Sequence, residues 1–122
     1  MAVLESVDAY LEGKDERAVA LFRRFEQLVD DCGLSEPAPR ASIVYWRRER
    51  VWAGAYIERA RLELNIDLLR EAEHPLLLAA FNTTKRVVTH RLRITEAEQL
   101  DDSIQKLLQE AYDHVGPGTR GG

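Results

Sequence analysis

The sequence predicts an α+β fold, in which two or three helices pack on a mainly antiparallel sheet of four strands. Apolar residues recur at helical spacing in residues 15–32 and again toward the C-terminus. Between these segments, in residues 41–68, the apolar period changes to two, which is typical of strands. The expected order is helix, helix, three strands, a short helix, strand and helix.

Two helices are expected at residues 3–12 and 15–32. Gly13 ends the first. Asp15 suits the positive N-terminal end of the second, and Gly33 follows its last turn. The core-facing residues of the second helix are Ala18, Leu21, Phe22, Phe25, Leu28, Val29 and Cys32.

Residues 35–39 are expected to form a linker, because they contain two prolines. The three strands that follow have short connections, which predicts an antiparallel meander. Their expected ranges are 41–46, 51–58 and 61–68.

The remaining elements are expected after the meander. The run at 73–82 predicts a short helix, and 86–94 predicts a fourth strand. Thr95 and Glu98 have the spacing of a capping box, so the last helix is expected to begin there and to end near His114.

The length of 122 residues fits one ordinary domain, 1–122, with an ordered core at 3–115 and a flexible tail at 116–122. The 45% apolar and 31% charged content argues against disorder. No apolar run is long enough to cross a membrane, and no secretory signal is visible. With a single cysteine, Cys32, these features predict a cytoplasmic protein.

Positive charge is concentrated in two segments. Residues 40–61 and 83–94 each carry a net charge of +4, although the whole chain carries −4. This asymmetry predicts a face that attracts anions, two layers that attract each other, or arginines paired across strands.

Aromatic residues give the best functional cue. Within 51–58, the aliphatic residues share one parity, whereas Trp52 and Tyr56 share the other. If the aliphatic residues face the helices, the rings face outward, where such side chains anchor interfaces and stack on ligands. The candidate ligand- or partner-binding residues are therefore Arg40, Trp46, Trp52, Tyr56, Arg91 and Arg93.

Other interpretations of this face stay open. Helices could cover it, or it could form a homodimer, hold a small molecule or peptide, or bind single-stranded nucleic acid. A pI of about 5.4 argues against nucleic acid.

His90 lies at the apolar parity of its strand, where a histidine is most often a hydrogen-bonded core residue. It is a weak catalytic candidate, since catalysis needs a neighbouring carboxylate or nucleophile and a cavity. No metal-ligand spacing and no nucleotide-binding or nucleophile motif occurs. No cofactor and no metal are therefore expected.

Three segments resemble a known family: "VDAYLEGKDERAVALFRRFEQLVDDCG", "PAPRASIVYWRRERVWAGAYI" and "VVTHRLRITEAEQLDDSIQKLLQEAY". They resemble the DUF5655 family of small bacterial domains and, more distantly, the DUF1801 (YdhG-like) domains. The family pattern is matched by Arg40, the 43–57 hairpin, His90 with Arg91, Asp101–Asp102 and Ala111–Tyr112. The resemblance carries no catalytic signature and implies an accessory or binding role.

The first hypothesis is a small non-enzymatic binding or interaction domain with an aromatic-plus-arginine sheet surface. The expected partners are a second copy of the chain or another protein, and a small anionic ligand. The alternatives are an enzyme of unknown type with a pocket around His90, or an accessory domain of a nucleic-acid-processing system.

Overall fold

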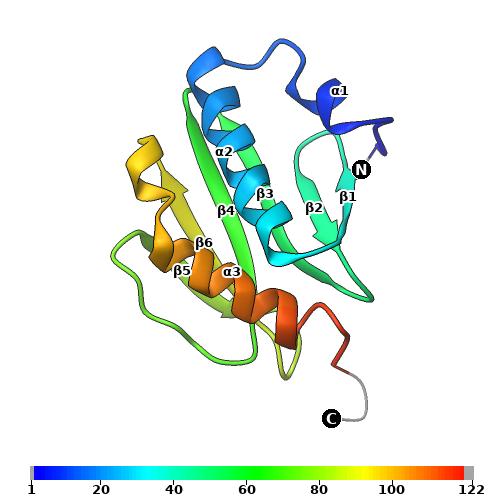
Figure 1. Ribbon diagram of the computed structural model, residues 1–122, viewed down its shortest axis with the longest axis vertical. Coiled ribbons are helices and arrows are strands. Elements are labelled where there is room, and N and C mark those ends of the chain that lie inside the picture. The colour runs from blue at the N-terminus through cyan, green and yellow to red at the C-terminus, as the bar shows by residue number, and fades with distance from the viewer. Residues whose placement is uncertain (1, 120–122) are drawn as a thin grey trace.

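The computed structural model describes residues 2–119, which form a six-stranded antiparallel sheet and three α-helices (Figure 1). The helices are α1 (Val7–Leu11), α2 (Glu16–Cys32) and α3 (Asp102–His114), with a 3-10 turn, η1 (Ala97–Gln99), before α3. The strands are β1 (Glu36–Pro39), β2 (Val44–Arg47), β3 (Val51–Glu58), β4 (Arg61–Leu68), β5 (Leu77–Asn82) and β6 (Val88–Ile94).

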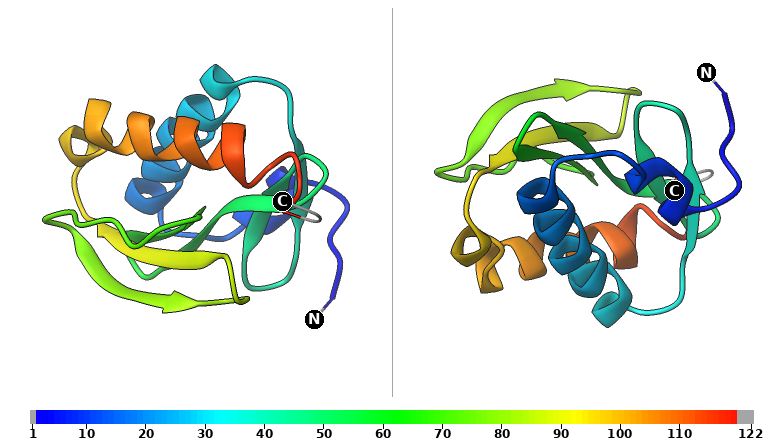
Figure 2. Two further views of the ribbon diagram at one scale, coloured as in Figure 1. Left: turned by 90° about the horizontal axis from the view of Figure 1, so that it is seen from below. Right: turned by 90° about the horizontal axis from the view of Figure 1, so that it is seen from above.

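The strands lie in the order β1-β2-β3-β4-β6-β5, and every pair is antiparallel. Helices α2 and α3 cover the same face of the sheet (Figure 2). We call the opposite face the open face. The α+β class with helices on an antiparallel sheet is confirmed, but the expected four strands are six.

The hydrophobic core lies between the helices and the covered face. Ala55 of β3, Leu64 of β4 and Leu92 of β6 are cross-strand partners, and all three are buried. From α2, Phe22 and Phe25 contact the same layer. The expected helix at 15–32 is confirmed, with Asp15 accepting hydrogen bonds at its start.

The expected linker at 35–39 is wrong, because β1 pairs with β2 there. The N–H of Arg40 donates to Ile43, so alternate residues along β1 face β2. The backbone nitrogens of Pro37 and Pro39, which carry no hydrogen, therefore face away from β2. Prolines at both outward positions are compatible with an edge strand.

The expected short helix at 73–82 is also wrong. Pro75 lies in a turn, where the His74 ring accepts a hydrogen bond from the N–H of Leu76 at 3.1 Å. The apolar run then continues as β5 and pairs with β6. The periodicity of this apolar run fits a helix as well as a strand, and the hydrogen bonds available along the edge of the sheet favour the strand.

Both ends of the chain differ from expectation. Helix α1 is shorter than the expected 3–12, because Val3 forms a bridge with Arg40 instead. The capping box lies at Glu96 and Gln99, around η1, and α3 begins separately after it.

Two of the C-terminal residues, Gly116 and Thr119, accept hydrogen bonds from the loops that precede β3 and β6. The N–H of Arg50 donates to Gly116, and Arg86 donates to the carbonyl of Thr119. Residues 120–122 of the expected flexible tail lie outside the described residues. No described helix is long and apolar enough to span a membrane.

Candidate functional site

The two tryptophans lie beneath the helices, so the expectation that they are exposed is wrong. Trp46 is 1% exposed and contacts Phe22 and Phe25 of α2. Trp52 is 0% exposed and packs edge-on against Tyr112 of α3. Neither ring is available to a ligand on the open face.

A β-bulge explains the error at Trp52. Trp46 pairs with Ala53, but the next residue, Arg47, pairs with Val51. Trp52 is therefore the extra residue of the bulge, and a bulge breaks the alternation of side chains. Beyond it, the aliphatic residues of β3 face the helices as expected.

The other candidate residues have different positions. Arg93 lies on the open face, opposite Glu63, and its guanidinium donates to that carboxylate at 3.0 and 3.2 Å. Tyr56 is half-buried and lies opposite Glu63 on the other neighbouring strand. Arg40 follows β1 and donates to the carbonyl of Pro39. Of the predicted arginines, Arg93 is thus already ion-paired.

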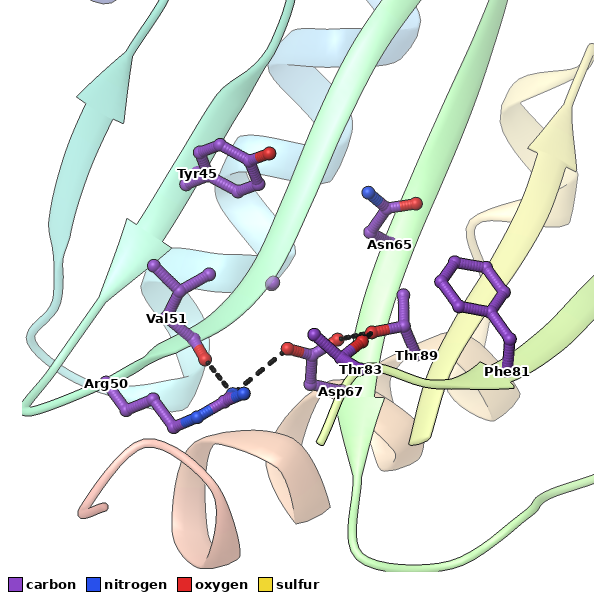
Figure 3. Close-up of a pocket in the computed structure, with 9 residues that line it drawn as sticks. Tyr45, Arg50, Val51, Asn65, Asp67, Phe81, Thr83 and Thr89 are labelled. Atoms are coloured by element: carbon purple, nitrogen blue, oxygen red, sulfur yellow. Dashed lines mark hydrogen bonds and ion pairs between the residues drawn. The ribbon is translucent and has the colours of Figure 1, made fainter. Parts of the chain in front are cut away.

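A pocket of about 370 Å³ lies on the open face. Figure 3 shows Tyr45 and Phe81 on opposite sides of it, with Asn65 between them. Gly54 lies opposite Tyr45, and a methyl group on Gly54 would lie only 3.2 Å from the tyrosine ring. Glycine thus lets the ring pack closely over the strand. The pocket is lined by Tyr45, Arg50, Val51, Ala53, Asn65, Asp67, Phe81, Thr83 and Thr89.

A closed polar cluster forms one end of the pocket (Figure 3). Arg50 donates to the Asp67 carboxylate at 3.1 Å, and the Thr89 hydroxyl donates to it at 2.7 Å. Because Thr89 donates its proton to Asp67, the Thr83 hydroxyl donates to Thr89. Asp67 is buried, and its charge is compensated by Arg50.

Two buried polar atoms beside this cluster have no hydrogen-bond partner among the described residues. They are Oδ1 of Asn65 and Nε of Arg91, which are on cross-strand partners. The Arg91 guanidinium carbon lies 5.8 Å from the centroid of the Phe81 ring. Arg91 forms no ion pair within residues 2–119. The open face thus has an unpartnered acceptor and two rings at one pocket, with the Arg91 cation next to Asn65 and over the Phe81 ring.

The model of one protein family, the domain of unknown function DUF5655, matches residues 7–115. The chain belongs to the DUF5655 family. This finding confirms the family resemblance of the three sequence segments. No curated protein and no solved structure matches the chain. The description of DUF5655 names no activity, so its function has to be argued from the site.

His90 of this DUF5655 chain is a core residue. Its Nε2 accepts from the N–H of Ala72 at 2.8 Å, and its Nδ1 lies 3.2 Å from the carbonyl of Ile66. With Nδ1 protonated, the neutral ring satisfies both contacts. His90 is buried and does not line the open-face pocket. The geometry assigns it a structural role.

On the helical side, the Cys32 thiol is not poised to react. Burial raises the pKa of the Cys32 thiol to about 11, which disfavours the thiolate. Within residues 2–119, no three histidine, cysteine, aspartate or glutamate side chains are grouped to hold a metal ion.

The pocket residues of this DUF5655 chain were mostly missed by sequence reasoning, which singled out only neighbouring Arg91. A signal existed for three of them. Asn65 and Asp67 have the polar parity of β4, and Thr89 has the same parity as Arg91 in β6. Tyr45 and Phe81 gave no such signal, because strand order brings them to the same pocket.

Proposed function

We propose that this DUF5655 chain is a binding domain whose open-face pocket holds a small planar ligand that carries an anionic group. The observation that carries the proposal is the buried, partnerless Oδ1 of Asn65 beside the pocket. Leaving a buried acceptor unpaired costs about 1–3 kcal/mol, so each such group needs an explanation, and among the unpaired side-chain atoms Asn65 Oδ1 belongs to a residue that lines the pocket. A ligand with an N–H donor would satisfy it.

The aromatic walls support a planar ligand. Tyr45 and Phe81 lie on opposite sides of the pocket, and rings on proteins favour stacked or edge-on contact with other rings (Figure 3). The pocket volume of about 370 Å³ lies in the range of small-ligand sites.

The local charge supports an anionic group. Asp67 is compensated by Arg50, and Glu63 is compensated by Arg93, so these pairs are close to neutral. Arg91 remains as a cation without an ion-pair partner among residues 2–119. Its guanidinium carries several donors, which suits a carboxylate or phosphate.

Calorimetric titration with three matched probes tests this proposal. Adenosine 5′-monophosphate has a planar base, an amino donor and a phosphate, whereas adenosine lacks the phosphate and ribose 5-phosphate lacks the base. We expect adenosine 5′-monophosphate to bind at least about tenfold more tightly than adenosine or ribose 5-phosphate, because each of these two makes only some of the contacts. Equal or undetectable binding of all three would contradict the proposal.

Arg91→Gln isolates the anion contact. The variant should lose most of the preference for the monophosphate over adenosine while its unfolding temperature stays close to that of the wild type. The matched control is Arg24→Gln, which removes an exposed arginine of α2 on the other side of the sheet. A preference for phosphate that survives Arg91→Gln would assign the anion to another group and refute this role.

A further inference from the structure

The edge strand β5 carries no charged residue and is apolar except for Asn82. Its sequence is LLAAFN, with no proline and no charged residue. Leu78 is 48% exposed and Phe81 is 44% exposed. An exposed apolar edge of this kind favours pairing with another strand.

The opposite edge, β1, is closed. Pro37 and Pro39 remove outward N–H groups, as described above. The N-terminal segment also lies along this edge, where the N–H of Leu4 donates to Pro39 at 3.1 Å. Only β5 therefore presents an unblocked edge within residues 2–119.

The outward-facing backbone groups of β5 follow from its pairing with β6. Thr83 donates its N–H to Val87 at 2.9 Å, which makes these two residues a hydrogen-bonded pair. Alternation then directs the N–H and C=O groups of Ala80 and Asn82 away from β6. Beyond the register shift at Leu78, these groups of Ala80 and Asn82 form a short ladder that a further strand can bond.

Charges at the two ends of β5 indicate which strand fits. Glu71 and Glu73 precede the strand, and Lys85 and Arg86 follow it; all four are exposed. Within the described residues, Glu71, Glu73 and Lys85 form no ion pair. In an antiparallel pair of two β5 strands, the acidic end of each copy lies beside the basic end of the other.

We propose that β5 is the interface for a second copy of this chain, in which two β5 strands pair antiparallel about a twofold axis. The result is one continuous twelve-stranded sheet. Main-chain hydrogen bonds join the edges, and the two exposed apolar side chains of each copy add contact area. The complementary ends fix the antiparallel direction. This inference does not rest on the ligand proposed for the pocket, although Phe81 belongs to both sites.

Sedimentation analysis with a matched pair of variants tests the interface. We expect the wild-type chain to be dimeric at about 100 µM. Leu78→Lys adds a charge to the exposed edge and should weaken dimerisation at least about tenfold. Leu34→Lys makes the same change at a residue that is 93% exposed and lies outside β5, so it should leave the dimer unchanged. A monomeric wild type, or equal dimerisation of all three, would overturn the proposal.

Charge reversal tests the direction of pairing. One variant carries Glu71→Lys and Glu73→Lys, and the other carries Lys85→Glu and Arg86→Glu. Each variant alone places like charges at both ends of its dimer and should dimerise at least about tenfold more weakly than the wild type at low salt.

An equimolar mixture of the two variants restores opposite charges at both ends. It should therefore form mixed dimers about as well as the wild type dimerises. Circular dichroism of each variant checks that it is folded before mixing. Folded variants that do not recover dimerisation on mixing would refute the antiparallel arrangement.

Discussion

Between β4 and β6, cross-strand partners on the helix-covered face are apolar apart from His90, whereas those on the open face are all polar or charged. Ala55, Leu64 and Leu92 lie in one row on the covered face. On the open face, Glu63 lies opposite Arg93 and Asp67 lies opposite Thr89. The comparison indicates that the covered face supplies stability through apolar burial, whereas the open face pairs most of its polar groups with one another and leaves Asn65 Oδ1 without a partner among the described residues.

The largest expected effect is seen when one aromatic side chain on each face of the sheet is truncated and the two losses of stability are compared. Trp52→Ala should lower the free energy of unfolding by about 3–5 kcal/mol, because it leaves a cavity under α3. Tyr45→Ala, on the half-exposed pocket wall, should cost about 1 kcal/mol. Urea denaturation measures both. Equal losses would contradict the assignment of stability to the covered face.

The second prediction concerns the buried histidine of the covered face. His90→Leu should lower the free energy of unfolding by about 1–3 kcal/mol, because the N–H of Ala72 loses its acceptor. The control is His114→Leu at the exposed end of α3, which should change stability by less than about 0.5 kcal/mol. A His90→Leu protein as stable as the wild type would show that these hydrogen bonds contribute nothing.

A smaller effect is expected at a partly exposed ion pair between the loop after β4 and α3. Arg70 donates two hydrogen bonds of 2.9 Å to Glu110 and lowers the pKa of that carboxyl from its ordinary value of 4.5. A carboxyl with a lowered folded pKa stabilises the protein above its unfolded pKa, and this contribution is lost as the pH falls through the folded pKa.

Arg70→Gln should therefore cost less than about 1 kcal/mol at pH 7, since the pair is partly exposed to solvent. The difference from the wild type should shrink as the pH falls below about 4. Denaturation at several pH values measures it, with Arg24→Gln as the exposed-arginine control. A difference that grew on acidification would have the wrong sign for this pair.

The covered face was largely predictable because its pattern is local. Apolar spacing located the helix at 15–32, and alternation correctly assigned Ala53, Ala55 and Ile57 of β3 to the core, whereas Val51, before the bulge, lines the open-face pocket instead. The prediction for Trp52 was wrong because Trp52 is the extra residue of the β-bulge, which reverses the direction of its side chain. No residue type nearby signals a bulge.

The open-face pocket was mostly not predictable because it depends on strand order. Tyr45 and Phe81 lie on different strands, and only the order β2-β3-β4-β6-β5 brings them to one pocket. The apolar run that contains Phe81 fits a short helix as well as a strand, so periodicity could not place it at an edge. Arg91 was found because parity within one strand is a local property.

The most direct test of the open face as a binding face is Asn65→Leu, assayed for stability and for binding of adenosine 5′-monophosphate. Because Oδ1 of Asn65 has no partner within residues 2–119, we expect the free energy of unfolding to change by less than about 1 kcal/mol. Affinity for the monophosphate should fall about tenfold, since the ligand loses its acceptor. A variant that loses more than about 2 kcal/mol of stability but binds the monophosphate as tightly as the wild type would contradict the account.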